Sequence, residues 1–213
     1  MSAPPDRIEI VTPEIGRSRT RRGLWAKRSL AALAVSVGLL GGSVGAYWGA
    51  VQYDGNFHTV SEGVLYRSAE LSKAGFEAAA RDHGIKSVLN LRGAHVGQGW
   101  YDDEIAAARE AGLAHFDYGI SAKRFVTGQQ IAEILDIVRR APKPLLIHCM
   151  SGADRTGLVA ALYRYTAGGQ SAAAADQQLS LRYGHFPYLG SRSVAMDDSF
   201  WAYVRQNGPA AAK

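Results

Sequence analysis

The stretch His148-Cys149-Met150-Ser151-Gly152-Ala153-Asp154-Arg155-Thr156-Gly157 decides how the rest of this 213-residue chain is interpreted. It lies between an apolar run at residues 145–147 and a helical pattern at residues 156–167. Its cysteine is the only thiol of the chain, and five residues separate that cysteine from Arg155. A loop of this length between a strand and a helix can direct successive backbone N–H groups toward one point, beside the positive end of the helix. The spacing therefore predicts an oxyanion site.

The side chains of this loop suit phosphoryl transfer. Arg155 can present two parallel N–H donors to two oxygens of a phosphate group. The positive field favours a thiolate at Cys149, because thiols beside cations at helix N-termini ionise with pKa values of roughly 3.5–7.5. Such a thiolate can attack a bound phosphomonoester to give a cysteinyl-phosphate, which water then cleaves. We therefore predict a phosphate-binding loop made of Met150, Ser151, Gly152, Ala153, Asp154 and Arg155.

The stretch resembles the signature of the Cys-x5-Arg phosphatases, in particular the dual-specificity branch of the protein tyrosine phosphatase superfamily. The signature His-Cys-x-x-Gly-x-x-Arg-[Ser/Thr]-Gly is matched at His148, Cys149, Gly152, Arg155, Thr156 and Gly157. The resemblance covers residues 57–206 and implies an α/β fold, with a central, mostly parallel sheet flanked by helices, and neither a metal nor an organic cofactor. It also implies that Cys149 attacks and Arg155 binds the phosphate, while His148 orients the loop and the Thr156 hydroxyl helps the thiolate to leave.

The Ala-Asp-Arg-Thr-Gly version of the loop is similar to that of bacterial broad-specificity and phosphoinositide-cleaving phosphatases of this superfamily.

The alternative for Cys149 is a buried structural cysteine, but the six matched positions and the flanking strand and helix favour the phosphatase. Rhodanese-like sulfurtransferases use a loop one residue shorter. Low-molecular-weight phosphatases and arsenate reductases carry their cysteine near the start of the fold, which does not suit position 149.

The leaving group needs a proton, and the sequence offers several carboxylates for it. The resemblance implies an aspartic acid on a separate loop, acting as general acid and then as base. The expected loop, residues 119–128, contains no carboxylate. Asp154 is the preferred candidate, because relatives with this Asp-Arg pair use it so, and Asp117, just before the expected loop, is the second. The remaining candidates are Asp102, Asp103 and Glu104.

Each of these assignments has a structural alternative. Asp154 could instead form a salt bridge with Arg155 or another cation, which would impair it as an acid. Lys123 and Arg124 would either attract a polyanionic head group or form a solvated loop face. For Arg67 and Arg92, which follow short apolar runs, a structural role is favoured over a place in the cleft.

The histidines do not indicate a metal site. Six of them are scattered without the spacing of metal ligands; they are His58, His83, His95, His115, His148 and His185. His185 is expected to pack in the core rather than in the pocket.

The charge of the chain is concentrated at its N-terminus. Residues 1–28 hold seven Lys and Arg against three acids, a net +4 of the total +5, so only +1 remains for the rest. A protein that binds nucleic acid would carry its basic residues on the folded domain. Nucleic acid is therefore excluded as a partner.

Residues 29–53 form a run of 25 residues without a charge, longer than the roughly 20 that cross a bilayer. This run predicts a single transmembrane anchor. Residues 16–28 carry six basic residues and no acid, so the positive-inside rule puts the N-terminus in the cytoplasm and the following domain in the periplasm, on the inner membrane. The alternatives are a buried soluble helix and a cleaved signal, since residues 20–24 form a loose twin-arginine motif and residues 44–46 a possible cleavage site.

Within the domain, hydrophobic spacing predicts several elements. The predicted strands are 64–67, expected at a sheet edge, 86–91, 114–118 and 145–147. The predicted helices are 72–83, 102–111, 127–141 with a capping box of Thr127 and Gln130, 156–167, 171–183 and 197–205.

The sequence thus predicts four segments: a basic cytoplasmic tail at 1–28, a transmembrane anchor at 29–53, a phosphatase domain at 54–208 and a disordered tail at 209–213. The predicted function is a membrane-anchored phosphomonoester phosphatase of the tyrosine or dual-specificity type, acting on a phosphorylated protein. A phospholipid or lipid-linked sugar phosphate of the envelope is the alternative substrate. A non-catalytic phosphate-binding module is the alternative class, and the sequence does not give the oligomeric state.

Overall fold

The structure, a computed structural model, describes residues 19–53 and 55–208, in two compact units, Met1–Ala46 and Tyr47–Lys213. Two predictions lie largely or wholly outside these residues. The first is most of the basic tail at 1–28, and the second is the disordered tail at 209–213.

A single long helix, α1 (Arg19–Tyr53), spans the predicted anchor and begins inside the predicted tail. Within it, Lys27–Tyr47 is long and apolar enough to cross a membrane. An N-terminal signal sequence has the same length and composition. The chain therefore has an N-terminal apolar helix that fits either an anchor or a signal.

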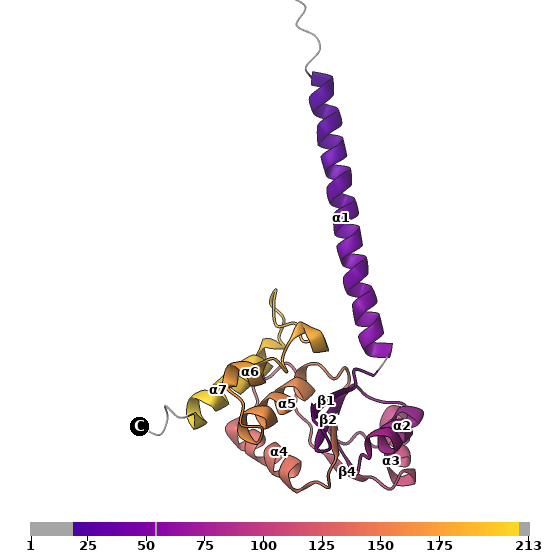
Figure 1. Cartoon of the computed structure of the whole chain (residues 1–213), viewed down its shortest axis with the longest axis vertical. Helices are drawn as coiled ribbons and strands as arrows, with labels where there is room; N and C mark the ends of the chain where they lie inside the picture. Colours follow the sequence, from indigo (N-terminus) through magenta and orange to yellow (C-terminus); the bar gives the residue numbers. More distant parts are fainter. Residues whose placement is uncertain (1–18, 54, 209–213) are drawn as a thin grey trace, which may run out of the picture. The chain divides into compact units, whose positions relative to one another are not determined.

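The second unit is built on one five-stranded sheet with the order β1-β2-β5-β3-β4 (Figure 1). β1 is antiparallel to β2, and the other neighbouring strands are parallel. The bounds are β1 His58–Ser61, β2 Leu65–Ser68, β3 Ser87–Asn90, β4 Ala114–Asp117 and β5 Leu145–His148. This is the predicted mostly parallel sheet, with β5 at its centre.

Helices cover both faces of the sheet: α2 and α3 lie on one side, and α4, α5, α6 and α7 on the other (Figure 1). Their bounds are α2 Lys73–His83, α3 Gly99–Glu110, α4 Gly128–Arg140, α5 Asp154–Thr166, α6 Ala172–Asp176, the 3₁₀ turn η1 Leu181–Tyr183 and α7 Val194–Asn207. The predicted capping box of Thr127 and Gln130 is present at the start of α4.

The central strand contributes to both halves of the core. Leu145 and Ile147 belong to the larger apolar cluster, whereas Leu146 belongs to the smaller one with Phe76 of α2 and Ala107 of α3. All three strand side chains are fully buried. Because both faces of β5 are covered, its end is held rigidly from two sides.

Two predictions about elements are wrong. The strand near residue 65 is not an edge strand, because β1, a mostly polar strand whose buried residue is Val60, pairs with its outer side. The predicted helix at 171–183 ends at Asp176. The carbonyl oxygen of Gln178 accepts a hydrogen bond from Arg67 at 2.9 Å, which takes it out of a helical ladder.

Candidate active site

The site lies at the carboxyl end of the central strand. Cys149 directly follows β5 and is 1% exposed, while Asp154 and Arg155 begin α5. Parallel α/β sheets place their ligands at this edge, where the positive end of a helix is also available. The structure thus brings the predicted loop residues 149–156 together at one strand–helix junction.

The first two carbonyl groups of the loop are hydrogen-bonded on its outer side. The backbone N–H of Glu70 donates to the carbonyl oxygen of Met150 at 3.3 Å. The side-chain amide of Asn56, which is 1% exposed, donates to the carbonyl oxygen of Ser151 at 2.9 Å. Both donors come from the β1–β2 side of the sheet, far away in the sequence.

The next two carbonyl groups are bound by one buried arginine. Arg67 Nη2 donates to the carbonyl oxygen of Gly152 at 2.7 Å and to that of Ala153 at 3.4 Å. In a trans peptide the C=O and the following N–H point in opposite directions. Four consecutive carbonyl groups held outward therefore turn the N–H groups of residues 151–154 inward, as an anion-binding loop requires.

Arg67 is a buried cation under the loop. Its side chain has no exposed surface, its other terminal nitrogen donates to Gln178, and its guanidinium lies 3.8 Å from the centre of the Tyr183 ring. Burial lowers the pKa of Arg67 to about 10, so the side chain remains charged at neutral pH. In the described part of the chain no carboxylate pairs with it. The sequence favoured a structural role for Arg67, and Arg67 fills such a role by binding carbonyl oxygens rather than a carboxylate.

Gly152 is required by the path of the loop. Its φ of +71° lies in the left-handed region, and a Cβ there would lie 2.7 Å from backbone atoms of Ser68 and Ala69. Only glycine lets the loop pack this closely against the end of β2.

Two polar side chains of α5 retain donors that the described residues do not use. Arg155 Nη1 makes long hydrogen bonds of 3.5 Å to the carbonyl oxygens of Leu91 and Ile120, while its Nε has no partner among the described residues. The buried hydroxyl of Thr156, adjacent in sequence, also lacks one there. Buried donors without partners are costly, so these groups fit an oxyanion bound beside Cys149.

His148 is oriented by a buried carboxylate. Its Nε2 lies 2.9 Å from Glu104 Oε1, which also binds His115 Nε2 at 2.7 Å. Burial alone would raise the pKa of Glu104, but the hydrogen bonds from His115 and His148 lower it to about 2. Glu104 therefore stays ionised at neutral pH and is unsuited to the role of general acid.

Asp117 belongs to a separate network on β4. Its carboxylate accepts hydrogen bonds from Tyr101 at 2.6 Å and Asn90 at 2.9 Å, and His115 Nδ1 lies 3.6 Å away. The hydrogen bond to Asp117 raises the pKa of Tyr101 to about 12. These contacts hold the carboxylate of Asp117 within the network on β4.

Asp154 is paired with a buried histidine rather than with Arg155, so the alternative of a salt bridge with another cation is the arrangement that the structure has. Asp154 Oδ1 lies 2.7 Å from His185 Nδ1, and Asp197 Oδ2 lies 2.8 Å from His185 Nε2. Burial would lower the pKa of His185, but the hydrogen bonds to Asp154 and Asp197 raise it to about 9. His185 is thus a buried cation at neutral pH. His185 lies in the core, as expected from the sequence, but it carries a charge there.

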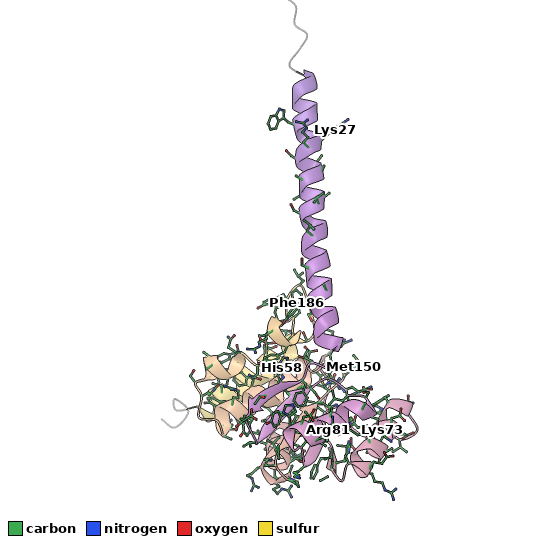
Figure 2. All side chains as sticks on the ribbon, turned by 45° about the vertical axis from the view of Figure 1, so that its right-hand side comes forward. Lys27, His58, Lys73, Arg81, Met150 and Phe186 are labelled. Carbon is green, nitrogen blue, oxygen red and sulfur yellow. The ribbon has the colours of Figure 1, made fainter. Side chains whose placement is uncertain are left out.

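Three further basic side chains that the sequence singled out are described by the structure. Arg92 pairs with Glu70, lies 3.3 Å from the centre of the Trp100 ring, and has a pKa lowered by burial and by the charge of Arg155. Lys123 and Arg124 are exposed in the segment that follows Ile120. Met150, beside the cysteine, is 62% exposed, and Figure 2 shows it on the second unit.

No group of three or more His, Cys, Asp and Glu side chains within residues 19–53 and 55–208 is suited to hold a metal ion. Sequence reasoning missed Asn56, His185 and Asp197 as parts of the site, and it did not identify Glu104 as the partner of His148. Asp154 and His185 are 31 positions apart, and Asn56 and Ser151 are 95 apart. Only the fold brings them together.

Comparison with known proteins gives a family and a fold. A family model described as "Tyrosine phosphatase family" matches residues 48–183, more than half of the chain. No curated protein sequence matches the chain.

Several solved structures share the fold. TpbA of P. aeruginosa, solved as a cysteine-to-serine variant in complex with pTyr, is 23% identical with a TM-score of 0.52, and the match covers 72% of this chain and 92% of TpbA. The core catalytic domain of the PP-IP phosphatase SIW14 from S. cerevisiae, solved with citrate, is 22% identical with a TM-score of 0.54, covering 71% and 92%. A putative phosphatase from Shewanella putrefaciens is 16% identical with a TM-score of 0.53, covering 69% and 92%.

Proposed function

This chain belongs to the tyrosine phosphatase family, whose members are cysteine-based hydrolases, and on that premise we propose that it hydrolyses protein phosphotyrosine through a cysteinyl-phosphate on Cys149. One observation carries the proposal. The carbonyl groups of residues 150–153 are all held outward, so four N–H groups turn toward the site that Cys149 and Arg155 border. This arrangement binds a tetrahedral oxyanion and can stabilise the charge that develops during transfer.

In the first step, the thiolate of Cys149 attacks phosphorus. The Sγ–P bond forms and the bond to the tyrosine oxygen breaks, while Arg155 and the loop amides hold the phosphoryl oxygens. The departing phenolate takes a proton from Asp154. Because His185 binds Oδ1 of Asp154, we place that proton on Oδ2.

In the second step, water attacks the phosphorus of the cysteinyl-phosphate. Asp154 Oδ2 accepts the proton of the water, the P–S bond breaks, and inorganic phosphate and the thiolate are formed. The hydroxyl of Thr156 donates a hydrogen bond to the sulfur as it leaves, which gives a function to an Oγ1 that has no partner among the described residues. His148, held by Glu104, fixes the end of β5 beneath the loop.

Phosphotyrosine is the preferred substrate because the matched family is described as tyrosine phosphatases and TpbA was crystallised with pTyr. The exposed Met150 and Phe125 give the surroundings of the loop apolar surface that a phenyl ring can contact. Phe125 lies five residues after Ile120, whose carbonyl oxygen contacts Arg155.

A second candidate substrate is a polyanionic lipid or lipid-linked phosphate of the envelope. The observation that favours it is the pair Lys123 and Arg124, both exposed on the segment next to Ile120. Such a pair can bind additional phosphate groups. The helix within Lys27–Tyr47 supports the accompanying proposal that the chain is anchored in the inner membrane with its catalytic unit in the periplasm.

The experiment compares phosphate release from a phosphotyrosine peptide, a phosphoserine peptide and phosphoinositide vesicles by the full-length protein. We expect the phosphotyrosine peptide to be the best substrate and the Cys149→Ser variant to bind it without releasing phosphate. Faster release from the vesicles would select the lipid candidate. Binding without release by the wild-type protein would select the non-catalytic module, and turnover by Cys149→Ser would contradict the mechanism.

Anchoring is tested separately by fractionation and by protease treatment of spheroplasts. We expect the full-length protein in the inner-membrane fraction, with its C-terminal unit digested from the outside. A soluble, shortened protein would show that the helix is a cleaved signal.

A further inference from the structure

The helices α5, α6 and α7 pack against one another (Figure 1). An ionic cluster that the two-step reaction leaves unexplained links side chains of α5 and α7. Its centre is His185, which has no exposed surface. Two carboxylates bind this ring, Asp154 from α5 and Asp197 from α7, and the charge of the ring also acts on Asp176 of α6. A buried cation among several acids costs desolvation free energy, so its position calls for a reason beyond packing.

The geometry of the cluster defines a chain of contacts that ends at the reacting group. Asp197 Oδ2 binds His185 Nε2 at 2.8 Å, and His185 Nδ1 binds Asp154 Oδ1 at 2.7 Å. When both ring nitrogens are protonated, each donates to a carboxylate, and the ring cannot rotate without losing both bonds. The carboxylate of Asp154, which is partly exposed, is thereby fixed through one of its two oxygens.

We propose that His185, held in place by Asp197, is a positioning residue that aims the carboxyl group of Asp154 at the leaving oxygen. This inference rests on the proposed function. With Oδ1 bound to His185, the orientation of Oδ2 is set before substrate arrives. The cation favours the carboxylate form of Asp154, which works against proton donation in the first step, so the gain there comes from the fixed orientation of Oδ2, while in the second step the carboxylate is the form required. The same carboxylate is then ready to take the proton of the attacking water.

The remaining acid of the cluster supports this arrangement. Burial and the charge of Asp197 raise the pKa of Asp176, and its Oδ1 has no hydrogen-bond partner among the described residues. Among the described residues no hydrogen bond joins Asp176 to His185. The hydrogen bonds to Asp154 and Asp197 are consequently the ones that hold the ring.

The test compares two substrates whose leaving groups differ in their need for a proton. Phenyl phosphate requires protonation of its leaving oxygen, whereas 2,4-dinitrophenyl phosphate does not. We expect His185→Gln to lower kcat for phenyl phosphate by about tenfold or more, with KM unchanged and with kcat for dinitrophenyl phosphate close to that of the wild type. His83→Gln, a replacement of an exposed histidine on α2, is the matched control and should leave both rates unchanged.

A double variant distinguishes positioning from general loosening of the fold. If His185 acts through Asp154, then adding His185→Gln to Asp154→Asn causes no further loss on phenyl phosphate. Asp197→Asn is an independent test, because the asparagine side chain has the shape of aspartate but lacks the charge that holds the His185 ring. It should reproduce the selective loss, and vanadate binding monitored by thermal shift should show that each variant is folded.

Equal losses on both substrates, or a further loss in the double variant, would overturn the positioning role of His185. Failure of the proposed function would look different, since wild-type protein would then release nothing from dinitrophenyl phosphate in a Cys149-dependent way. The two outcomes can therefore be told apart in one set of measurements.

Discussion

Arg67 Nη2 lies 2.7 Å from the carbonyl oxygen of Gly152, so a fully buried cation holds the back of the phosphate-binding loop. The same guanidinium reaches the carbonyl oxygens of Ala153 and Gln178. This one side chain connects β2, the loop and the segment after α6. It also places a positive charge behind the site where an anion is expected to bind.

The first prediction concerns this contact. Arg67→Met leaves the carbonyl groups of Gly152 and Ala153 buried without a donor, at a cost of about 1–3 kcal/mol each. We expect a lower free energy of unfolding in urea and a vanadate affinity reduced by about tenfold or more. Arg81→Met is the control, because Arg81 is exposed on α2, and it should change stability by no more than about 0.5 kcal/mol. Unchanged vanadate affinity in folded Arg67→Met would show that Arg67 does not shape the loop.

The second prediction concerns the conformation of Gly152. Gly152→Ala puts a methyl group 2.7 Å from the backbone of Ser68 and Ala69, so the loop must move. We expect kcat/KM to fall by about a hundredfold or more, since misplacement of about 1 Å has that effect. The matched control is Gly169→Ala: Gly169 also has a positive φ, of +64°, but has open space around it. Similar kinetics for the two variants would mean that close packing of the loop is unimportant.

The third prediction concerns stability at acid pH. Glu104 has a folded pKa of about 2 against an ordinary 4.5, so it stabilises the protein above about pH 4.5. That contribution is lost as the pH falls from about 4.5 to about 2, because the unfolded chain takes up the proton first. We expect the free energy of unfolding to decline over this range, and the decline to be smaller in Glu104→Gln. Urea titrations at a series of pH values measure both, and parallel curves for the two proteins would contradict the assignment.

The fourth prediction concerns the general acid. Asp154→Asn should lower kcat for phenyl phosphate by roughly 10²–10⁴-fold, and far less for dinitrophenyl phosphate. Asp117→Asn should affect the two substrates alike, because Asp117 is engaged with Tyr101 and Asn90. A selective loss in Asp117→Asn instead would transfer the role to Asp117.

Local features of the sequence were sufficient to predict the centre of the fold. The apolar run before Cys149, the cysteine-to-arginine spacing and the capping box of Thr127 are all encoded within a few residues. Such short-range patterns predicted the strand β5, the helices α4 and α5, and the placement of the loop between strand and helix.

The supporting contacts could not be predicted in this way. Arg67 and Gly152 are 85 positions apart, and Glu104 and His148 are 44 apart, so no periodic pattern connects them. A buried arginine paired with carbonyl oxygens also leaves no trace in the charge pattern, since it needs no nearby acid. The antiparallel strand β1 was missed because His58–Ser61 is mostly polar and holds one buried apolar residue, Val60, so it shows no apolar run.

The most direct test of the central claim is rapid-quench mass spectrometry of the full-length protein during turnover of an aryl phosphate. We expect a phosphoryl adduct on the peptide that contains Cys149, formed before phosphate is released. The adduct should be more abundant in Asp154→Asn with dinitrophenyl phosphate, because the second step then lacks its base. Sustained turnover without any adduct on Cys149, or with an adduct on another residue, would contradict the account.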